Sequence, residues 1–471
     1  MPTFSIENFG CRATDADAAA IRDSLARRGF SLAARHDQAD VVVLNSCTVT
    51  ASADAQSREA IRKIHRANPS ARIIVTGCYA QRAPDELAVI PGVAAVVGNA
   101  HQSEIAELAA EVGSSSSPAL VSIATLETGS MSLERGPAKI LTSDIFRQAD
   151  LSFAAAGPPA GDRTRPILKI QDGCNNRCSY CVIPYVRGGS RSLAPGSVVE
   201  EAGRHVAAGA QEIVLSGINL GSYGRDLTPR TSLAEIAVRI LAETEIERLR
   251  FSSIEPQDVT EDFSSLVAAN PRIAPHFHVP LQSGSDRILR AMHRRYRAAH
   301  YAERIRRLHG LLPDAAIGAD VIAGFPGETP ADFQATADLV ERLPFSYLHV
   351  FSFSARPGTK AEGMQGAVPA AEIHERARFL RALSEKKAAA FRRSQQGRIL
   401  RALALHRRGE GWTEALTGNY LRVRAAGEFP ANTWITLKVT PTLEERAGEA
   451  RIHEAAARPA MPPETALSTY S

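Results

Sequence analysis

The residues of this chain that could perform chemistry most directly are six cysteines, because thiolates bind iron and zinc. Three of them, Cys174, Cys178 and Cys181, form a Cys-x3-Cys-x2-Cys array. Three thiolates at this spacing can hold three irons of a 4Fe–4S cluster and leave the fourth iron open to a ligand. A structural zinc site would need a fourth ligand, and no histidine or further cysteine stands nearby.

The other three cysteines, Cys11, Cys47 and Cys78, are far apart in the sequence. Each one taken alone would more often be a buried apolar thiol than a ligand. However, each follows an apolar strand-like run and precedes a helical pattern, and the carboxyl ends of parallel strands meet at one edge of a sheet. Three thiolates that converge there would fit a second 4Fe–4S cluster with an open iron.

The elements that position the early cysteines are expected in a domain of residues 1–112. Apolar runs at 3–6, 41–44, 72–76 and 93–97 alternate with helical patterns. This rhythm predicts an α/β domain with a parallel sheet covered by helices.

Residues 113–165 contain serine, glycine and proline clusters and little periodicity, and they are expected to form a linker. Residues 166–396 then repeat a strand–helix pattern six times, which predicts a partial (β/α)6 barrel whose chemistry lies on the loops after the strands. The expected strands of this domain are 167–170, 212–216, 249–253, 276–281, 317–324 and 347–353.

Residues 397–458 change to short β-type segments separated by glycine, asparagine and proline, which predicts a small β-barrel, and residues 459–471 are expected to be a tail. Tyr420, Arg422 and Arg424 alternate, which would place aromatic and basic groups on a sheet surface suited to binding RNA.

The composition supports a globular protein without an obvious membrane or export signal. Apolar residues make up 44% of the chain, no run of eighteen apolar residues occurs, and the cytoplasm is the default location. The net charge of +4 does not by itself indicate a nucleic-acid partner. Residues 286–310 hold eight arginines and two acids, which fits either a solvated helix face or RNA binding.

The segments KIQDGC (169–174), YCVIPY (180–185) and Arg191-Ser192 resemble the radical-SAM methylthiotransferases. The resemblance implies that an open iron held by Cys174, Cys178 and Cys181 binds S-adenosylmethionine, which one electron cleaves to a 5′-deoxyadenosyl radical. It also implies that Tyr180 lies near the adenine of the cofactor.

The segments around the early cysteines, Gly10-Cys11, NSCTVT (45–50) and TGCYAQ (76–81), are similar to the same family. The resemblance implies an auxiliary cluster on Cys11, Cys47 and Cys78 that carries the sulfur for the product. Thr14 stands where the family usually has asparagine, and the C-terminal barrel resembles the RNA-binding TRAM module.

The resemblance also implies residues that contact S-adenosylmethionine on the barrel loops: Gly217, Glu255, Gln282 and Asp320, for which loop architecture is the alternative role. Two molecules of S-adenosylmethionine are expected per turnover, one for methyl and one for the radical. A low-potential electron donor such as flavodoxin or ferredoxin is implied, and the sulfur donor remains open.

The flanks of the cysteines resemble the branch of the family that methylthiolates C2 of N6-threonylcarbamoyladenosine next to the anticodon in tRNA. Alternatives are N6-isopentenyladenosine in tRNA, an aspartate of a ribosomal protein, and a non-catalytic iron–sulfur RNA-binding protein. A threonylcarbamoyl group carries a carboxylate, and Arg187 and Arg191 are candidates for recognising it.

Overall fold

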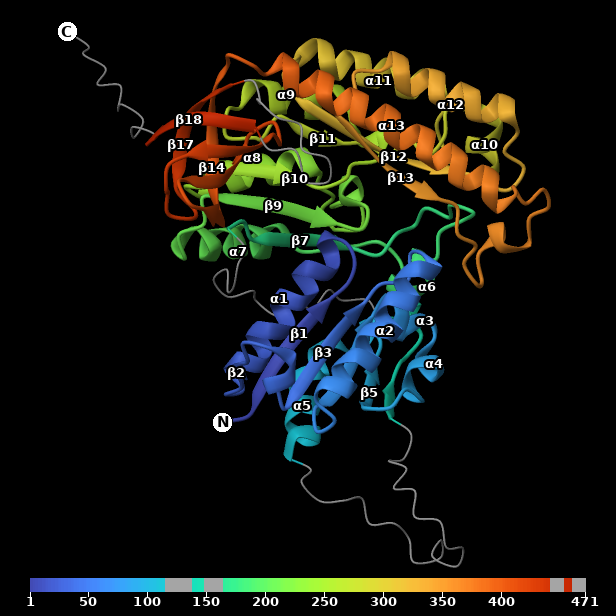
Figure 1. Cartoon of the computed structure of the whole chain (residues 1–471), viewed down its shortest axis with the longest axis vertical. Helices are drawn as coiled ribbons and strands as arrows, with labels where there is room; N and C mark the ends of the chain where they lie inside the picture. The colour runs from blue at the N-terminus through green and yellow to red at the C-terminus, as the bar shows by residue number, and fades with distance from the viewer. Residues whose placement is uncertain (115–137, 148–163, 441–452, 460–471) are drawn as a thin grey trace, which may run out of the picture.

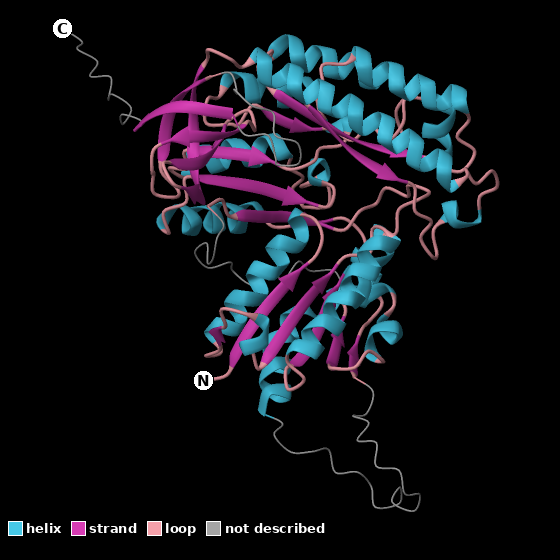
Figure 2. Cartoon of the chain, in the orientation of Figure 1, coloured by secondary structure: helices cyan, strands magenta, loops and turns pink. Residues whose placement is uncertain are grey.

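The structure is a computed structural model that describes residues 1–114, 138–147, 164–440 and 453–459. Figure 1 shows three parts: an N-terminal sheet with helices, a larger central strand–helix domain, and a C-terminal β-barrel at one end of it. Figure 2 shows the same parts by helix and strand. No helix in the described part of the chain combines the length and apolar character needed to cross a membrane.

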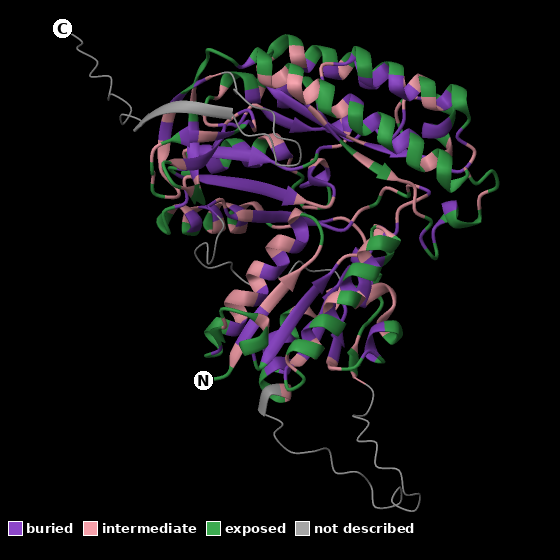
Figure 3. Ribbon diagram, in the orientation of Figure 1, coloured by how far each residue is buried: buried purple, intermediate pink, exposed green. Residues whose placement is uncertain are grey.

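The N-terminal domain is a parallel sheet in the order β2-β1-β3-β4-β5-β6. Its central strands are buried because helices pack on both faces, as the burial colours of Figure 3 show. The strands are β1 (Thr3–Asn8), β2 (Ser31–Leu32), β3 (Val41–Ser46), β4 (Arg72–Gly77), β5 (Val93–Val97) and β6 (Lys139–Leu141). The helices are α1 (Arg12–Arg27), α2 (Ala51–Ala67), α3 (Cys78–Arg82), α4 (Pro84–Ala88) and α5 (Ile105–Ser114).

The four strands expected in this domain are confirmed, and two short edge strands, β2 and β6, were not predicted. Strand β6 lies inside the expected linker 113–165, where it pairs in parallel with β5. Three residues are too few to produce a periodic pattern, so only the sheet reveals this strand. The rest of that stretch, 115–137 and 148–163, lies outside the described residues.

The central domain is a partial barrel of six parallel strands, as predicted. Its two sheets, β10-β9-β7-β8 and β11-β12-β13, are joined by isolated bridges between Leu249 and Ile273 and between Ser253 and His278. The strands are β7 (Ile167–Asp172), β8 (Arg191–Ser192, antiparallel to β7), β9 (Glu212–Gly217), β10 (Arg248–Phe251), β11 (His276–His278), β12 (Ala316–Ala323) and β13 (Tyr347–Ser352).

Helices follow the strands of the barrel and bury one continuous apolar core against them. They are α6 (Ile183–Arg187), α7 (Pro195–Ala207), α8 (Leu233–Glu243), α9 (Glu261–Ala269), α10 (Asp286–Ala291), α11 (Ala298–Leu311), α12 (Pro330–Arg342) and α13 (Ala370–Ser394). Side-chain caps define several helix starts, and Ser232 forms a capping box with Glu235. Helix α1 of the N-terminal domain contacts β7 and β9, so that domain lies at the open side of the barrel.

The C-terminal domain is a closed barrel in the order β14-β15-β16-β18-β17. Its strands are β14 (Ile399–Gly409), β15 (Trp412–Thr417), β16 (Arg422–Ala426), β17 (Trp434–Val439) and β18 (His453–Pro459). β18 was not among the expected strands, and residues 460–471 of the expected tail lie outside the described part. The domain docks on β10, where Arg248 donates to the Leu416 carbonyl and Arg250 to the Gly418 carbonyl.

The prediction that Tyr420 lies on the sheet surface beside Arg422 is wrong. Tyr420 belongs to the turn before β16 and has a φ of 65°. Its ring stacks on His276 of the central barrel, with 4.2 Å between centroids. The Thr417 hydroxyl donates to the Asn419 side chain and stabilises this turn. Because the strand begins only at Arg422, the alternation of side chains between the two faces of the sheet does not include Tyr420.

Candidate functional site

The loops that carry Cys11, Cys47 and Cys78 converge at one edge of the N-terminal sheet, as expected. In the sheet, Asn8 of β1 pairs with Asn45 of β3, and Ser46 pairs with Gly77 of β4. A Cβ atom on Gly10 would lie 3.3 Å from Cys47 Cβ. Gly77 has a φ of 94°, and a side chain there would collide with the Ser46 backbone. Glycine thus lets these loops approach closely.

The environment of Cys47 and Cys78 keeps their thiols protonated when no metal is bound. Burial, followed by the charges of Cys78 and Cys11, raises the pKa of Cys47 to about 11. Burial also raises the pKa of Cys78, against the lowering effect of Arg187. Cys78 and Cys11 thus both act on Cys47, and a metal centre that binds these sulfurs would displace protons.

Cys174, Cys178 and Cys181 lie in the loop after β7. The backbone N–H of Cys174 donates to the Gly188 carbonyl at 3.0 Å, and that of Cys181 donates to the Cys178 carbonyl at 3.1 Å. Burial and the charges of Cys178 and Cys174 raise the pKa of Cys181 to about 12. This loop therefore also brings three thiols to one place, at the carboxyl end of the first barrel strand.

Both triads fit a multinuclear cluster better than a single metal ion. A zinc ion with ligands at about 2.3 Å would bring its sulfurs to roughly 3.8 Å from one another. Among the described residues, the only histidine, cysteine or carboxylate group whose ligand atoms all lie within 4.8 Å of one another is His278, Asp320 and His349. A cubane cluster holds each thiolate on a different iron, which fits the wider spacing and leaves one iron for another ligand.

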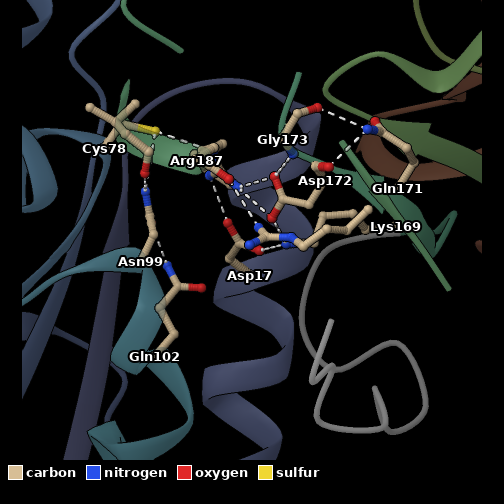
Figure 4. Close-up of polar contacts among 12 residues, drawn as sticks. Asp17, Cys78, Asn99, Gln102, Lys169, Gln171, Asp172, Gly173 and Arg187 are labelled. Carbon is tan, nitrogen blue, oxygen red and sulfur yellow. Dashed lines mark hydrogen bonds and ion pairs between the residues drawn. The ribbon is translucent and has the colours of Figure 1, made fainter. Parts of the chain in front are cut away.

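A buried guanidinium links the early triad to the barrel domain across the domain interface (Figure 4). The Arg187 Nε–H donates to Cys78 Sγ at 3.2 Å, although Arg187 follows the cysteines of the barrel loop in sequence. Its other nitrogens contact Asp17 of α1 at 2.8 Å and Asp172 of β7 at 3.1 Å. Only 1% of the Arg187 side chain is exposed, so the whole network is shielded from water.

Lys169 completes this network, because its Nζ contacts both Asp17 and Asp172. Burial raises the pKa of Asp172, but Lys169 and Arg187 outweigh that effect and hold it well below its usual range. The two cations and two carboxylates neutralise each other where the N-terminal domain meets the barrel. Arg187 and Arg191 were expected to recognise a substrate carboxylate, but Arg187 is occupied by its ion pairs with Asp17 and Asp172.

A second buried guanidinium, Arg294, accompanies the barrel triad. Its Nη1 donates to Cys178 Sγ at 3.5 Å and to Glu255 at 3.2 Å. Arg294 and Asp17 were both missed by the sequence reasoning: Arg294 lies far from any cysteine in the sequence, and Asp17 lies on a helix whose pattern does not reveal its partners in the barrel. A pocket of about 200 Å³ opens beside this triad. Its lining residues are Arg177, Cys178, Ser179, Cys181, Pro184, Tyr185, His293, Thr359 and Lys360.

The residues expected to contact S-adenosylmethionine are placed around the barrel mouth. Tyr180 is half-buried and its ring packs edge-on against Phe325, with 6.4 Å between ring centroids, and Glu255 pairs with Arg294. Gln282 has a φ of 65°, and its backbone N–H donates to the Asp320 carbonyl at 2.8 Å.

Gly217 ends β9 where a side chain would clash with Gln171, at 2.8 Å from its Oε1. Asp320 lies deeper, between His278 at 3.1 Å and His349 at 3.3 Å.

The two arginines expected to bind RNA lie on the C-terminal barrel. Arg422 is half-exposed and donates to Glu414 at 2.8 Å. The Arg424 guanidinium stacks over Trp412, 4.7 Å from the ring centroid. Both residues belong to β16. Their role in binding RNA stays a prediction.

Comparison with known proteins matches two parts of the chain to families. Residues 3–98 match a family described as "Uncharacterized protein family UPF0004", and residues 168–340 match the radical SAM superfamily. The chain resembles the structure of the radical S-adenosylmethionine methyltransferase TsrM from Kitasatospora setae, with cobalamin and a 4Fe–4S cluster bound. The TM-score is 0.52 at 17% identity, covering 77% of this chain and 74% of TsrM, which supports the fold.

The fold and the cysteine loop after the first barrel strand thus define a radical-SAM protein. The chain is 36% identical to threonylcarbamoyladenosine tRNA methylthiotransferase MtaB of Aquifex aeolicus, over 90% of this chain and 96% of the relative. It is 33% identical to tRNA-2-methylthio-N(6)-dimethylallyladenosine synthase of Acidothermus cellulolyticus, over 93% and 83%. The chain belongs to the radical-SAM methylthiotransferase family, which uses S-adenosylmethionine and two 4Fe–4S clusters.

Proposed function

We propose that this protein transfers a methylthio group to C2 of N6-threonylcarbamoyladenosine next to the anticodon of a tRNA. The observation that supports this best is the contact between the two cysteine-bearing domains, where Arg187 of the barrel donates to Cys78 of the N-terminal domain. Replacement of an aromatic hydrogen by a methylthio group needs both a radical initiator and a sulfur donor near one carbon. The two triads, one in each of two domains in contact, provide one location for each.

In this proposal each triad has its own task. S-adenosylmethionine and a cluster on Cys174, Cys178 and Cys181 supply the radical chemistry, and a cluster on the other triad supplies the sulfur. Arg187 and Arg294 each donate a hydrogen bond to one cysteine sulfur and so lower the cost of burying thiolate charge. The protein's own contribution is to hold both centres in a dry, fixed relation.

The relatives support the substrate. Threonylcarbamoyladenosine tRNA methylthiotransferases from Aquifex aeolicus and Bacillus subtilis are 36% and 34% identical to this chain. The second candidate substrate is N6-isopentenyladenosine, supported by dimethylallyladenosine synthases at 33–35% identity. The proposal includes RNA contacts from Arg422 and Arg424, a flavodoxin or ferredoxin as electron donor, and action in the cytoplasm.

The decisive experiment offers reconstituted protein, S-adenosylmethionine and a reductant to tRNA from cells that lack one prior modification. Mass spectrometry of the nucleosides should show 2-methylthio product only where the threonylcarbamoyl group is present. Product that forms without this group but disappears without isopentenylation would assign the second substrate instead.

A further inference from the structure

Arg12, the residue after Cys11, reaches from the N-terminal domain toward the interior of the barrel. Its Nη2 donates to the Tyr420 hydroxyl at 3.2 Å, and its Cζ lies 5.9 Å from the centroid of the Tyr420 ring. Tyr420 belongs to the C-terminal domain. A guanidinium next to one ligand of the early triad thus meets a side chain from the opposite end of the sequence.

Arg12 lies at the end of the barrel interior where the strands begin. We call this end the barrel floor, and Tyr420, His276 and Tyr347 form it. Tyr420 stacks on His276, the first residue of β11, and its ring centroid lies 6.2 Å from that of Tyr347, the first residue of β13. The Tyr347 hydroxyl and His276 Nε2 are 2.8 Å apart. All three domains therefore contribute to this floor, and the positive φ of Tyr420 is maintained by these contacts.

The next layers of the interior are also polar and aromatic. His278 lies parallel to the Tyr347 ring with a 5° interplanar angle and 5.9 Å between centroids. Two residues further along β12 and β13 than the pair Gly318 and Tyr347, Asp320 pairs with His349 in the sheet. The Asp320 carboxylate contacts both His278 and His349. The two histidines thus share a carboxylate partner.

Arg12 differs from most of the buried guanidinium groups that join the domains, whereas Arg177 of the barrel-triad loop likewise contacts aromatic rings, those of Phe146 and Tyr185. Arg187, Arg250, Arg294 and Arg356 are all paired with carboxylates. Within the described ranges, Arg12 has no carboxylate partner, and its hydrogen bond and its cation–π contact are both with Tyr420. Burial raises the pKa of Tyr420, but Arg12, Arg165 and Arg250 outweigh it and the pKa lies below the usual value. The nearby guanidinium groups therefore favour negative charge at the Tyr420 oxygen.

We propose that Arg12 binds the carboxylate of the threonylcarbamoyl substituent and so selects the substrate. This inference rests on the proposed function. In adenine, C2 and C6 flank N1, so a base whose C2 faces the centre held by Cys11 places its N6 group on the same side of the ring system, near the next residue. The planar guanidinium can bind a carboxylate with two parallel hydrogen bonds. An isopentenyl group offers no acceptor and would leave the guanidinium with Tyr420 alone.

The test uses anticodon stem-loop RNAs that carry either threonylcarbamoyladenosine or its methyl ester, which removes the charge and keeps the shape. We expect the reconstituted wild-type protein to prefer the acid by about 10- to 100-fold in dissociation constant, as measured by fluorescence anisotropy, and in kcat/KM. Arg12→Gln should abolish this preference by weakening the binding of the acid RNA and leaving that of the ester RNA unchanged. Arg12→Lys should retain part of the preference.

Two control variants separate recognition from structure. Arg28→Gln changes an exposed arginine at the other end of α1 and should keep the acid-to-ester ratio. Tyr420→Phe removes the hydroxyl that Arg12 contacts and should also keep the ratio, because Arg12 retains its charge. Iron content of each variant verifies that the clusters are assembled.

The outcomes distinguish this inference from the proposed function. If wild-type protein modifies the threonylcarbamoyl RNA and Arg12→Gln keeps the acid-to-ester ratio, the inference is wrong and the proposed function stands. If Tyr420→Phe loses the ratio as fully as Arg12→Gln, Arg12 only holds the domains together and the inference is again wrong. If wild-type protein modifies only isopentenyl RNA, the proposed function itself fails.

Discussion

The two cysteine triads present the same three ligands in two different ways. Cys174, Cys178 and Cys181 come from one loop after β7, and their spacing in the sequence largely sets their positions. Cys11, Cys47 and Cys78 follow three separate strands, and the register of a parallel sheet sets theirs. The first arrangement tolerates changes elsewhere in the fold, whereas the second depends on the packing of a whole domain.

The largest expected effect comes from removing each triad in turn. Replacing Cys174, Cys178 and Cys181 by alanine should reduce the iron content from about eight to about four per chain and abolish cleavage of S-adenosylmethionine. Replacing the three early cysteines should reduce iron equally but preserve cleavage, since only the barrel triad lies at the radical-SAM site. Unchanged iron content in the second variant would show that the early cysteines hold no cluster.

The next effect compares the two buried arginines. Arg187→Met leaves Asp172 and Asp17 with Lys169 alone, and the free energy of unfolding should fall by about 3–5 kcal/mol. Arg294→Met leaves Glu255, whose pKa burial already raises. Glu255 can therefore take up a proton, and the loss should be smaller, about 1–3 kcal/mol.

Urea unfolding of the apo-proteins at pH 7 measures both arginine variants. Retention of iron after gel filtration shows whether Arg187→Met releases the early cluster selectively. Equal losses of stability and of iron in the two variants would mean that Arg187 contributes no more to the domain interface than Arg294 contributes to the barrel.

A smaller effect should depend on pH. The pKa of Asp172 is lowered in the folded protein because Lys169 and Arg187 outweigh burial. Its charge therefore stabilises the fold above the ordinary carboxylate pKa, and this contribution is lost as the pH falls below that value. The difference in unfolding free energy between wild type and Asp172→Asn should be about 1–3 kcal/mol at pH 7 and should shrink toward pH 3. A constant difference would place the stabilising charge elsewhere.

The smallest effect concerns Arg422 of the C-terminal barrel, whose ion pair is with Glu414 of the same domain and not with either triad. Arg422→Ala should weaken tRNA binding a few-fold and reduce the slope of log affinity against log salt by about one unit, because one phosphate contact is lost. Iron content and S-adenosylmethionine cleavage should stay as in wild type. An unchanged salt slope would remove Arg422 from the RNA-binding surface.

The sequence predicted the main elements because their patterns are local. Long buried strands such as β3 and β12 stand out as apolar runs, and the six-strand barrel follows from their repetition. β6 escaped prediction because three residues form no periodic pattern, and β18 because its sequence HEAAARP lacks the β-branched and aromatic residues typical of strands. Tyr420 was misplaced for a related reason: its turn ends the alternation, and contact with His276 then fixes it inside another domain.

The sequence by itself determined which thiols could bind clusters, because cysteine spacing and the strand–helix rhythm are written in order along the chain. The tertiary structure decided how the charges are shared around them. Arg187 looked like a candidate for binding substrate, but Asp17, which lies far away in the sequence, occupies it. Arg12 looked unremarkable, yet the fold places it at the barrel floor without a carboxylate partner among the described residues. Long-range ion pairing in a buried interface depends on distances in space, and these become known only when the domains pack.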